Sequence, residues 1–556
     1  MNTPGSSFTV EWDDPSDAQA FWIMDAIHCP EPMRRLDFDL RMAPMLQVNA
    51  AEGVRLGFPL TSEPRLIHGF IFNKLISRDV APEALPGILQ ACDDLIRSEY
   101  SDLAGRWEKT WLPEIQSHLS ALSAFDPRSA SLPELLTGLV QLRERVCKLW
   151  ELHSRILTPT VLALSDFEDT YRTLVPDAKA LDAYELVGGF PNKTLEANAR
   201  LWDLGRTAAR SPALRAVLVD TPPAKLQTEL AASEEGRALL ASLHEYLRVY
   251  GERNDDLISE KPTWIEDPTP VLRGLREAVL QPDRDLASEL QQAAARREAK
   301  LGAVRAALSS HPRAAVEEFE RLLKEAQTAN VLTEDHHFWI DCKITYHVRR
   351  VAMEIGRRLH ARGVLGQDVD VFHLSLAELS ALGEDVSDDR VAALRRLVEA
   401  HQAEAARFAG VSPPMMLGIP RPFLPMDCAV TRGMAKFSGN IFMPPAAPGA
   451  DLVGMPGSSG KARGPARIVK SLDDTVKLQP GDIMVTAFTL PSWTPFFASV
   501  AGVVTNIGGM LCHSAVVARE YRIPSVVGTV RATETYTDGQ LIEVDGDAGI
   551  VRIVSA

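Results

Sequence analysis

The dominant pattern over residues 22–409 is helical, with apolar residues recurring at spacings of three and four. These runs are rich in Ala, Leu, Glu and Arg, which are good helix formers. The pattern is clearest over 285–329, where Pro312 interrupts it and predicts two helices joined near His311. We predict further helices over these approximate ranges: 84–122, 131–157, 233–250, 334–363 and 388–409.

The pattern changes near residue 411. The strings PPMMLGIPRPFLP and FMPPAAPGADLVGMPG contain too much Pro and Gly for a helix or a central strand. Beyond them, short Val and Ile runs are bounded by Gly, Asp and Pro and predict strands: ARIV, DIMV, AGVVT, PSVVG, LIEV and GIVRIV. One helix is predicted from Cys512 to Tyr521. The chain therefore reads as a multidomain α + α/β protein, mainly helical over 1–410, with a Pro/Gly-rich connection over 411–453 and a small α/β domain over 454–556.

Size and charge narrow the possible partners. The chain has 556 residues, enough for about three to five domains. Its 59 basic and 74 acidic residues give a net charge of −15, which lacks the positive field that nucleic-acid binding requires. The acidic excess belongs to the helical part, because residues 454–556 carry equal numbers of acidic and basic side chains. We expect no nucleic-acid partner.

The sequence also bears on where the chain works. It contains no run of about 18 apolar residues, and its first residues show no basic region followed by an apolar one. Its six cysteines are scattered without a CxxC pair, which favours free thiols in a reducing compartment. We therefore expect a cytoplasmic protein without a membrane partner.

The segment TNIGGMLCHSAVVAREYRIPSVVG, residues 505–528, holds the most informative histidine. After a predicted strand, Gly508 and Gly509 predict a tight turn with exposed backbone amides, and His513 lies near the start of the next helix. A helix N-terminus offers unpaired N–H groups and a partial positive charge, which favour an anion. A phosphoryl group on His513 would be stabilised there. Spacing alone leaves open a capping or packing role for this histidine.

The string GGMLCHSAVVAREYRIPSVVGT resembles the phosphohistidine segment of the swivelling domain in phosphoenolpyruvate-utilising enzymes, which include phosphoenolpyruvate synthase, pyruvate phosphate dikinase, rifampin phosphotransferase and phenylphosphate synthase. The strings GMPGSSGKARGPARIV, GDIMVTAFTLPSWTPFF and DGQLIEVDGDAGIVRI extend the resemblance. It implies that residues 454–556 form a swivelling domain phosphorylated on His513. Cys512 stands where this family usually has Ser or Thr, and a thiol is a weaker hydrogen-bond donor. The candidate residues for stabilising the phosphoryl group are Thr505, Gly508, Gly509 and Arg519.

Two segments of the helical part also have a counterpart. YGERNDDLISEKPTWIEDP and EDHHFWIDCKITYHVRRVAMEIGRRLHARGVLGQDVDVFHLSLAEL resemble the substrate-binding helical domain of rifampin phosphotransferase and of phenol-phosphorylating synthases. This resemblance implies that residues 1–410 bind the phosphate acceptor.

The charged helix near residues 334–358 has two possible interpretations. It can be a solvated helix stabilised by ion pairs between its turns. Alternatively, Arg349 or Arg350 faces a cleft and neutralises the transferring phosphoryl group, while His337 or His347 accepts the proton of the acceptor. Phosphoryl transfer depends mostly on positioning and charge, which favours an arginine as the essential group. No residue is assigned to a metal.

Family members that make phosphoenolpyruvate carry an ATP-grasp region before the swivelling domain and a pyruvate-binding barrel after it. Here the helical part shows no Gly-rich phosphate loop, and 43 residues follow His513. The resemblance thus implies one subunit of a dikinase-type phosphotransferase. A separate ATP-grasp subunit binds ATP and Mg²⁺ and phosphorylates His513, giving AMP and phosphate. The swivelling domain turns about a linker near residues 443–457.

The acceptor implied by the resemblance is the hydroxyl group of a phenol, a cresol or a similar apolar alcohol, as in phenylphosphate synthase. Three alternatives remain. The chain can be a subunit of an antibiotic phosphotransferase that acts on a rifamycin-like hydroxyl. It can be a phosphocarrier or regulatory protein without a small-molecule acceptor of its own. It can also be a degenerate scaffold in which Cys512 has abolished phosphorylation.

Overall fold

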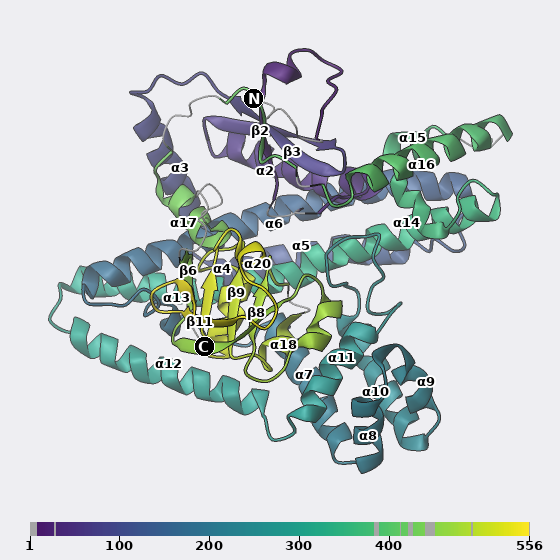
Figure 1. Cartoon of the computed structure of the whole chain (residues 1–556). Helices are drawn as coiled ribbons and strands as arrows, with labels where there is room; N and C mark the ends of the chain where they lie inside the picture. Colours follow the sequence, from purple (N-terminus) through teal and green to yellow (C-terminus); the bar gives the residue numbers. More distant parts are fainter. Residues whose placement is uncertain are drawn as a thin grey trace.

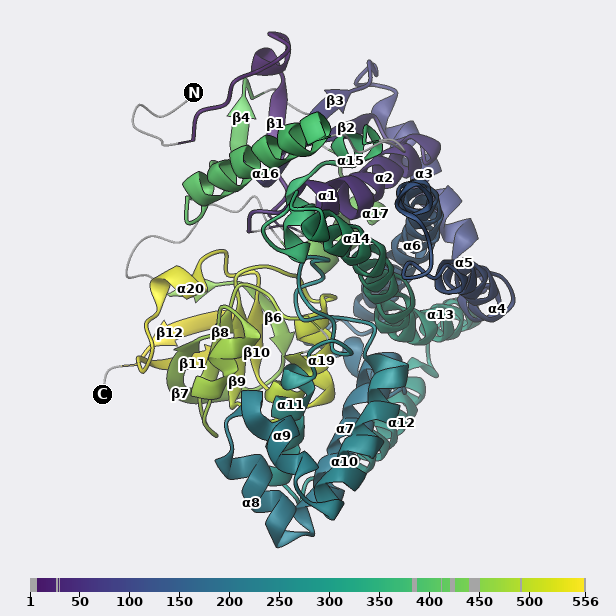
Figure 2. The same ribbon diagram turned by 90° about the vertical axis from the view of Figure 1, so that its right-hand side faces the viewer.

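The computed structural model describes residues 8–26, 29, 31–382, 388–411, 413–420, 426–439, 451–490 and 493–554. In two perpendicular views, the C-terminal domain (yellow-green) lies against long helices, between a small N-terminal sheet and a group of shorter helices (Figures 1 and 2). The multidomain α + α/β organisation that the sequence predicts is confirmed.

Long packed helices form the frame of the helical part. Helix α6 (Leu132–Leu174) contacts α2 (Ala43–Arg55), α13 (Arg313–His337) and α14 (Lys343–Ala361). Leu, Val and Ile side chains from these helices fill the largest core cluster. Burial of this much apolar surface is the main stabilising term.

Helices α13 and α14 are one continuous helix, because the π-helix η6 (Phe338–Cys342) joins them without a break. The prediction that a helix starts near residue 334 was therefore wrong. No Gly or Pro occurs between Arg313 and Ile355, so nothing in the sequence ends the helix there. The predicted junction near His311 is confirmed, since α12 (Leu286–Leu308) ends just before it.

The remaining helices pack around this frame. A second core cluster is formed mainly by α7 (Lys193–Ala209), α8 (Pro212–Asp220), α9 (Leu226–Ala231), α10 (Glu234–Tyr250) and α11 (Thr269–Leu280). The others are α1 (Arg35–Asp37), α3 (Leu85–Glu99), α4 (Leu103–Arg106), α5 (Leu112–Ala124), α15 (Leu376–Ser380) and α16 (Asp388–Phe408). The helix predicted over 84–122 is thus divided, and the one predicted over 131–157 continues to Leu174. The helices predicted over 233–250 and 388–409 are confirmed.

The N-terminal part also contains an antiparallel sheet, which the sequence patterns did not predict. Its order is β2-β3-β1-β4, formed by β1 (Phe21–Met24), β2 (Leu60–Ile67), β3 (Phe70–Ser77) and β4 (Met416–Gly418). Strand β2 lies at an edge, where Pro64 and several polar residues are tolerated. Because these residues interrupt the alternation of apolar and polar positions, the sequence pattern did not predict a strand here.

The predicted connection over 411–453 is partly built from regular structure. Strand β4 pairs with β1, and α17 (Ala429–Ser438) packs against α6. The reading of this region as too rich in Pro and Gly for a helix was therefore wrong for 429–438, which contain no Pro. The predicted swing linker falls partly on residues 443–450, which lie outside the described residues.

The C-terminal domain contains every predicted strand. Its sheet has the order β5-β12-β11-β7-β8-β9-β10-β6, and β7 to β10 run parallel to one another. The strands are β5 (Leu452–Val453), β6 (Met455–Ser458), β7 (Lys461–Ile468), β8 (Ile483–Thr486), β9 (Gly502–Thr505), β10 (Ser525–Val527), β11 (Leu541–Asp545) and β12 (Ile550–Ile553). The helices are α18 (Thr494–Phe497), α19 (His513–Glu520) and α20 (Ala532–Thr535).

Helix α17 also supports the C-terminal domain. The amides of Gly509 and Leu511 donate to the carbonyls of Phe437 and Lys436, each at 2.9 Å. A Cβ atom on Gly509 would lie 2.1 Å from the Lys436 carbonyl oxygen, so only glycine permits this approach.

Among the described helices, none combines the length and the apolar character needed to cross a lipid bilayer.

Helix α17 depends in turn on a buried carboxylate of α3. Asp93 is 6% exposed and accepts hydrogen bonds from the amides of Ala429 at 2.8 Å and Val430 at 3.1 Å. Asp93→Ala would leave both amides without an acceptor, so we expect it to lower the free energy of unfolding by about 1 to 3 kcal/mol. Urea unfolding measures this loss. Asp94→Ala, which removes an exposed carboxylate from the same helix, should cost about 0.5 kcal/mol or less, and equal losses would contradict the capping role.

Candidate functional site

His513 is the first residue of α19 and lies at the contact between the two domains. Its Nδ1 atom is 3.0 Å from both carboxylate oxygens of Glu334, on α13 of the helical part. Because an ionised carboxylate only accepts hydrogen bonds, we assign the ring proton to Nδ1. The Nε2 atom is buried and has no hydrogen-bond partner among the described residues. This arrangement leaves a lone pair on Nε2, the condition for a nucleophile.

Glu334 is held ionised in a buried position. The side chain is 3% exposed, and the Thr194 hydroxyl donates to its Oε2 atom at 2.7 Å. Burial alone would raise the pKa of Glu334, but the hydrogen bond of His513, its charge whenever the ring is protonated, and the hydrogen bond of Thr194 lower it to about 2. The carboxylate therefore remains charged at any physiological pH.

The glycine turn before α19 is built differently from the sequence-based expectation. Gly508 has a φ of 110°, which confirms a tight turn, but the Gly509 amide donates to the Phe437 carbonyl and is not exposed. Thr505 is completely buried, and its hydroxyl donates to the Ile507 carbonyl at 2.8 Å. In this docked arrangement these groups shape the turn that presents His513.

Arg519 links strand β6, the turn before α19 and the helical part. Its Nη1 atom donates to the carbonyls of Gly457 at 2.8 Å and Met510 at 2.7 Å. Its guanidinium also lies over the ring of Tyr184 in the helical part, 4.8 Å from the centroid. Burial lowers the pKa of Arg519. These contacts indicate that Arg519 fixes the position of α19, in addition to any effect on a phosphoryl group.

Arg349 and Arg350 are not brought to His513. Both lie on α14, about 20 Å along the helix axis from Glu334 at 1.5 Å per residue. Arg349 pairs with Glu266 at 2.7 Å and donates to the Glu260 carbonyl, while Arg350 donates to the Phe125 carbonyl. The hypothesis that they neutralise the transferring phosphoryl group is therefore not supported by this arrangement, because their guanidinium groups hold neighbouring loops.

His337 lies one helical turn from Glu334, but its surroundings do not suit a base. Its Nδ1 atom is 3.0 Å from Oδ2 of Asp341. Burial would lower the pKa of His337, but Cys342 and Asp341 raise it well above its usual value, so the ring is a cation at neutral pH. The alternative base His347 lies farther along α14, and burial lowers its pKa to about 3. The structure thus favours His337 as a source of positive charge.

Mostly polar contacts complete the docking surface. The Glu520 carboxylate accepts from the Gly189 amide at 3.0 Å, and Tyr521 bonds to Asn198. Arg284 donates to the Ala498 carbonyl at 2.9 Å. A cleft of about 410 Å³ separates the domains next to these contacts, and its basic lining residues are Arg296, Arg297, Lys461, Arg519 and Arg522. A polar interface of this kind suits domains that dock and separate.

Sequence reasoning missed Glu334 and Thr194 as site residues. Glu334 belongs to the charged run EDHH, but its contact with His513 joins positions 179 residues apart. Thr194 follows Asn192, whose side chain caps α7. The cap signal could have located the start of that helix, but nothing in the sequence relates it to His513.

The fold and the site together define a class of protein. A small α/β domain presents a histidine at a helix start and rests on a larger helical domain. Residues 478–549 match the family model "PEP-utilising enzyme, mobile domain", and residues 153–334 match "Rifampicin phosphotransferase fourth domain". The chain thus combines a mobile domain of the phosphoenolpyruvate-utilising enzymes with a domain of the rifampicin phosphotransferase type, as the sequence motifs predicted.

Several curated proteins are similar over long stretches. The chain is 41% identical over 98% of its length to a part, 14%, of chondramide synthase cmdD from Chondromyces crocatus. It is 28% identical over 97% of its length to 62% of the uncharacterized phosphotransferase YvkC from Bacillus subtilis. It is 30% identical over 66% of its length to 40% of rifampicin phosphotransferase from Streptomyces sviceus. The chain thus spans less than two thirds of each of these relatives.

The charge of Glu334 should control docking. Glu334→Gln keeps an acceptor for His513 but removes the charge, which weakens a hydrogen bond worth about 1.5 to 3 kcal/mol. We expect amide hydrogen exchange to become roughly tenfold to a hundredfold faster in α19 and at Gly189. Mass spectrometry of exchanged peptides measures this exchange rate. Glu318→Gln, at a more exposed position of α13, is the matched control, and similar exchange in both variants would argue against docking by Glu334.

The same carboxylate predicts a pH dependence. Glu334 has a pKa of about 2 in the folded protein and an ordinary value of 4.5. A lowered carboxyl pKa contributes stability that is complete above the ordinary value and is lost as the pH falls toward the folded value. The wild type should therefore exceed Glu334→Gln in free energy of unfolding at pH 6, by a margin that shrinks below pH 4.5. Paired urea-unfolding curves at pH 6, 4.5 and 3 test this, and a constant margin would be inconsistent with it.

Proposed function

We propose that this chain is a phosphotransferase subunit in which His513 carries a phosphoryl group from ATP to a hydroxyl acceptor bound by the helical part. One observation carries the proposal: Glu334 fixes the protonated Nδ1 of His513, while Nε2 has no hydrogen-bond partner in the described part of the chain. The matches to the mobile domain and to the rifampicin phosphotransferase domain support the same assignment.

The geometry suggests how His513 is used. In the loading step, the Nε2 lone pair attacks a phosphorus atom of the donor, an N–P bond forms and the donor P–O bond breaks. The ring then becomes positively charged, and Glu334 offers the complementary charge when the domain is docked. In the transfer step, the acceptor oxygen bonds to phosphorus, the N–P electron pair returns to Nε2, and the hydroxyl proton passes to a base or to water.

ATP and Mg²⁺ are assigned to a separate ATP-grasp subunit, which would release AMP and phosphate. Mg²⁺ prefers oxygen ligands and phosphates. Among the described residues, the one cluster of three metal-ligating side chains has two histidines and one aspartate, which does not fit Mg²⁺. No step of this proposal is therefore routed through a Mg²⁺ ion held by this chain.

A carrier that serves two sites has to move between them. The polar contacts of Glu520, Tyr521 and Arg284 can be replaced by water when the C-terminal domain leaves, at low cost per contact. Domain movements of this kind take microseconds to milliseconds, which is fast enough for ordinary enzyme turnover.

The acceptor in this proposal is a phenol, a cresol or a similar apolar alcohol. The match of residues 153–334 to a rifampicin phosphotransferase domain favours a second candidate, a bulky hydroxyl compound of the antibiotic type. Both candidates need a site in the helical part, which a phosphocarrier without its own acceptor does not. Screening phenols, alcohols and rifamycins against the phosphorylated chain distinguishes these three cases.

The proposal predicts a phosphorylated histidine. With ATP labelled at the β-phosphate and an ATP-grasp protein encoded beside this chain or co-purifying with it, the wild type should take up acid-labile, base-stable label. His513→Ala should take up none, while its fold is retained. His244→Ala removes an exposed histidine of α10 and should label like the wild type. Absence of label on the wild type, with a partner that cleaves ATP, would reject the proposal.

A further inference from the structure

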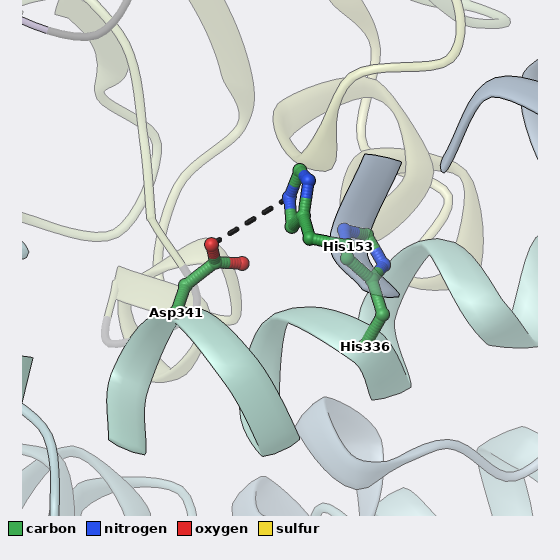
Figure 3. A group of neighbouring side chains, drawn as sticks. All are labelled: His153, His336 and Asp341. Carbon is green, nitrogen blue, oxygen red and sulfur yellow. Dashed lines mark ion pairs between the residues drawn. The ribbon is translucent and has the colours of Figure 1, made fainter. Parts of the chain in front are cut away.

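A second group of titratable side chains lies inside the helical part, close to Glu334. It consists of His153 from α6, His336 from α13 and Asp341 from η6. One nitrogen or oxygen atom from each lies within 4.8 Å of the others. Figure 3 shows the Asp341 carboxylate directed at the His153 ring, with the His336 ring beside it. His336 and Asp341 are 4% and 9% exposed, so the group is shielded from solvent.

The π-helix explains why two of these residues share one side. His336 and Asp341 are five positions apart, which on an α-helix would place them roughly 140° apart around the axis. Hydrogen bonds from i to i+5 add one residue to the turn and bring such positions nearer to one face. A π-turn costs stability and occurs frequently at functional sites. Here it directs Asp341 toward His153 of the neighbouring helix.

Two of the three side chains, His336 and Asp341, are oriented by a second contact. Nδ1 of His336 is 2.5 Å from the Leu332 carbonyl oxygen, so Nδ1 carries the proton and Nε2 keeps its lone pair. Oδ2 of Asp341 is bonded to His337, while Oδ1 is 3.6 Å from Nε2 of His153. Metal-binding histidines commonly donate their other ring N–H to a backbone carbonyl, and metal-binding carboxylates are commonly hydrogen-bonded as well.

We propose that His153, His336 and Asp341 bind a divalent transition-metal ion such as Zn²⁺. At Zn–ligand distances near 2.1 Å, ligands of a tetrahedral site are about 3.4 Å apart. The separation of 3.6 Å between His153 and Asp341 is already close to this value, and the remaining ligand needs a side-chain adjustment of about 1 Å. Two nitrogen donors and one oxygen donor favour Zn²⁺ or another first-row ion over Mg²⁺ or Ca²⁺. Three protein ligands leave a coordination position open, as in catalytic sites.

The location suggests a use for the ion, and this part rests on the proposed function. His337 contacts Asp341 and lies one helical turn from Glu334, the partner of His513. The metal position is therefore one side chain away from the phosphohistidine pair. An acceptor oxygen on the open position would lose its proton more readily and could then attack the phosphorus atom.

Metal binding can be tested without any transfer reaction. The full chain is dialysed against EDTA and titrated with Zn²⁺ alone by calorimetry, and bound metal is counted by mass spectrometry. Co²⁺ alone serves as a spectroscopic probe through its visible absorption bands. We expect one ion per chain for the wild type. Failure of the wild type to bind either ion would overturn the proposal.

Variants then locate the ion. Asp341→Asn and His153→Gln each remove a ligand and should weaken Zn²⁺ binding at least a hundredfold, whereas His337→Gln should weaken it about tenfold to a hundredfold. His347→Gln is the matched control, because His347 is a similarly buried histidine of α14 outside the cluster, and it should bind as the wild type. Circular dichroism checks that each variant folds. If Asp341→Asn does not fold, Zn²⁺ binding by His153→Gln decides the assignment. Unchanged binding in the folded ligand variants would overturn the assignment.

The two proposals fail separately. Zn²⁺ binding at the cluster without label on His513 would keep the metal site and reject the phosphotransferase. Label on His513 without Zn²⁺ binding would keep the phosphotransferase and reject the metal site.

Discussion

The buried hydrogen bond between Glu334 and His513 is the interaction on which the arrangement of the two domains depends. Glu334 keeps the hydrogen bond of Thr194 in either state, but a buried carboxylate with too few partners is destabilising, so the imidazole that the C-terminal domain supplies stabilises the helical part. When that domain leaves, water has to take its place at Glu334. The Glu334 carboxylate is therefore either bonded to His513 or solvated by water. The free-energy difference between these two states sets how long His513 stays at the helical part.

The rest of the structure positions the two members of this pair. The unbroken helix from Arg313 to Ala361 holds Glu334 in the middle of the body, where α6 packs against it. In the C-terminal domain, β9, the glycine turn and α19 fix His513 beyond the C-terminal end of a central parallel strand. Polar contacts surround the pair, and apolar side chains also cross the interface, because Ala498 and Tyr521 pack against Trp202, Ala278 and Leu286. The site is rigid within each domain and adjustable between them.

The sequence predicted the features that depend on local pattern. The strands of the C-terminal domain and the start of α19 follow from short apolar runs and a glycine pair. The role of His513, which a long motif suggests, stays a prediction. The sheet containing β2 was missed because Pro64 and polar residues hide its period at an edge. Glu334 could not be chosen from its charged neighbours, because its importance comes from a contact across 179 residues. Arg349 and Arg350 were chosen for their charge, but in this structure nearby carbonyls and Glu266 use that charge, and their part in phosphoryl transfer stays a prediction.

The contact between α17 and the glycine turn gives the proposed cycle a direction. While the C-terminal domain is docked, the amides of Gly509 and Leu511 are occupied by the carbonyls of Phe437 and Lys436. Those amides become available to an anion only when the turn moves away from α17. A phosphoryl group on His513 is thus less stabilised at the helical part than away from it. In the proposed cycle these two backbone hydrogen bonds would favour phosphate donation where the acceptor is bound, against the stabilisation that the docked Glu334 gives the charged ring.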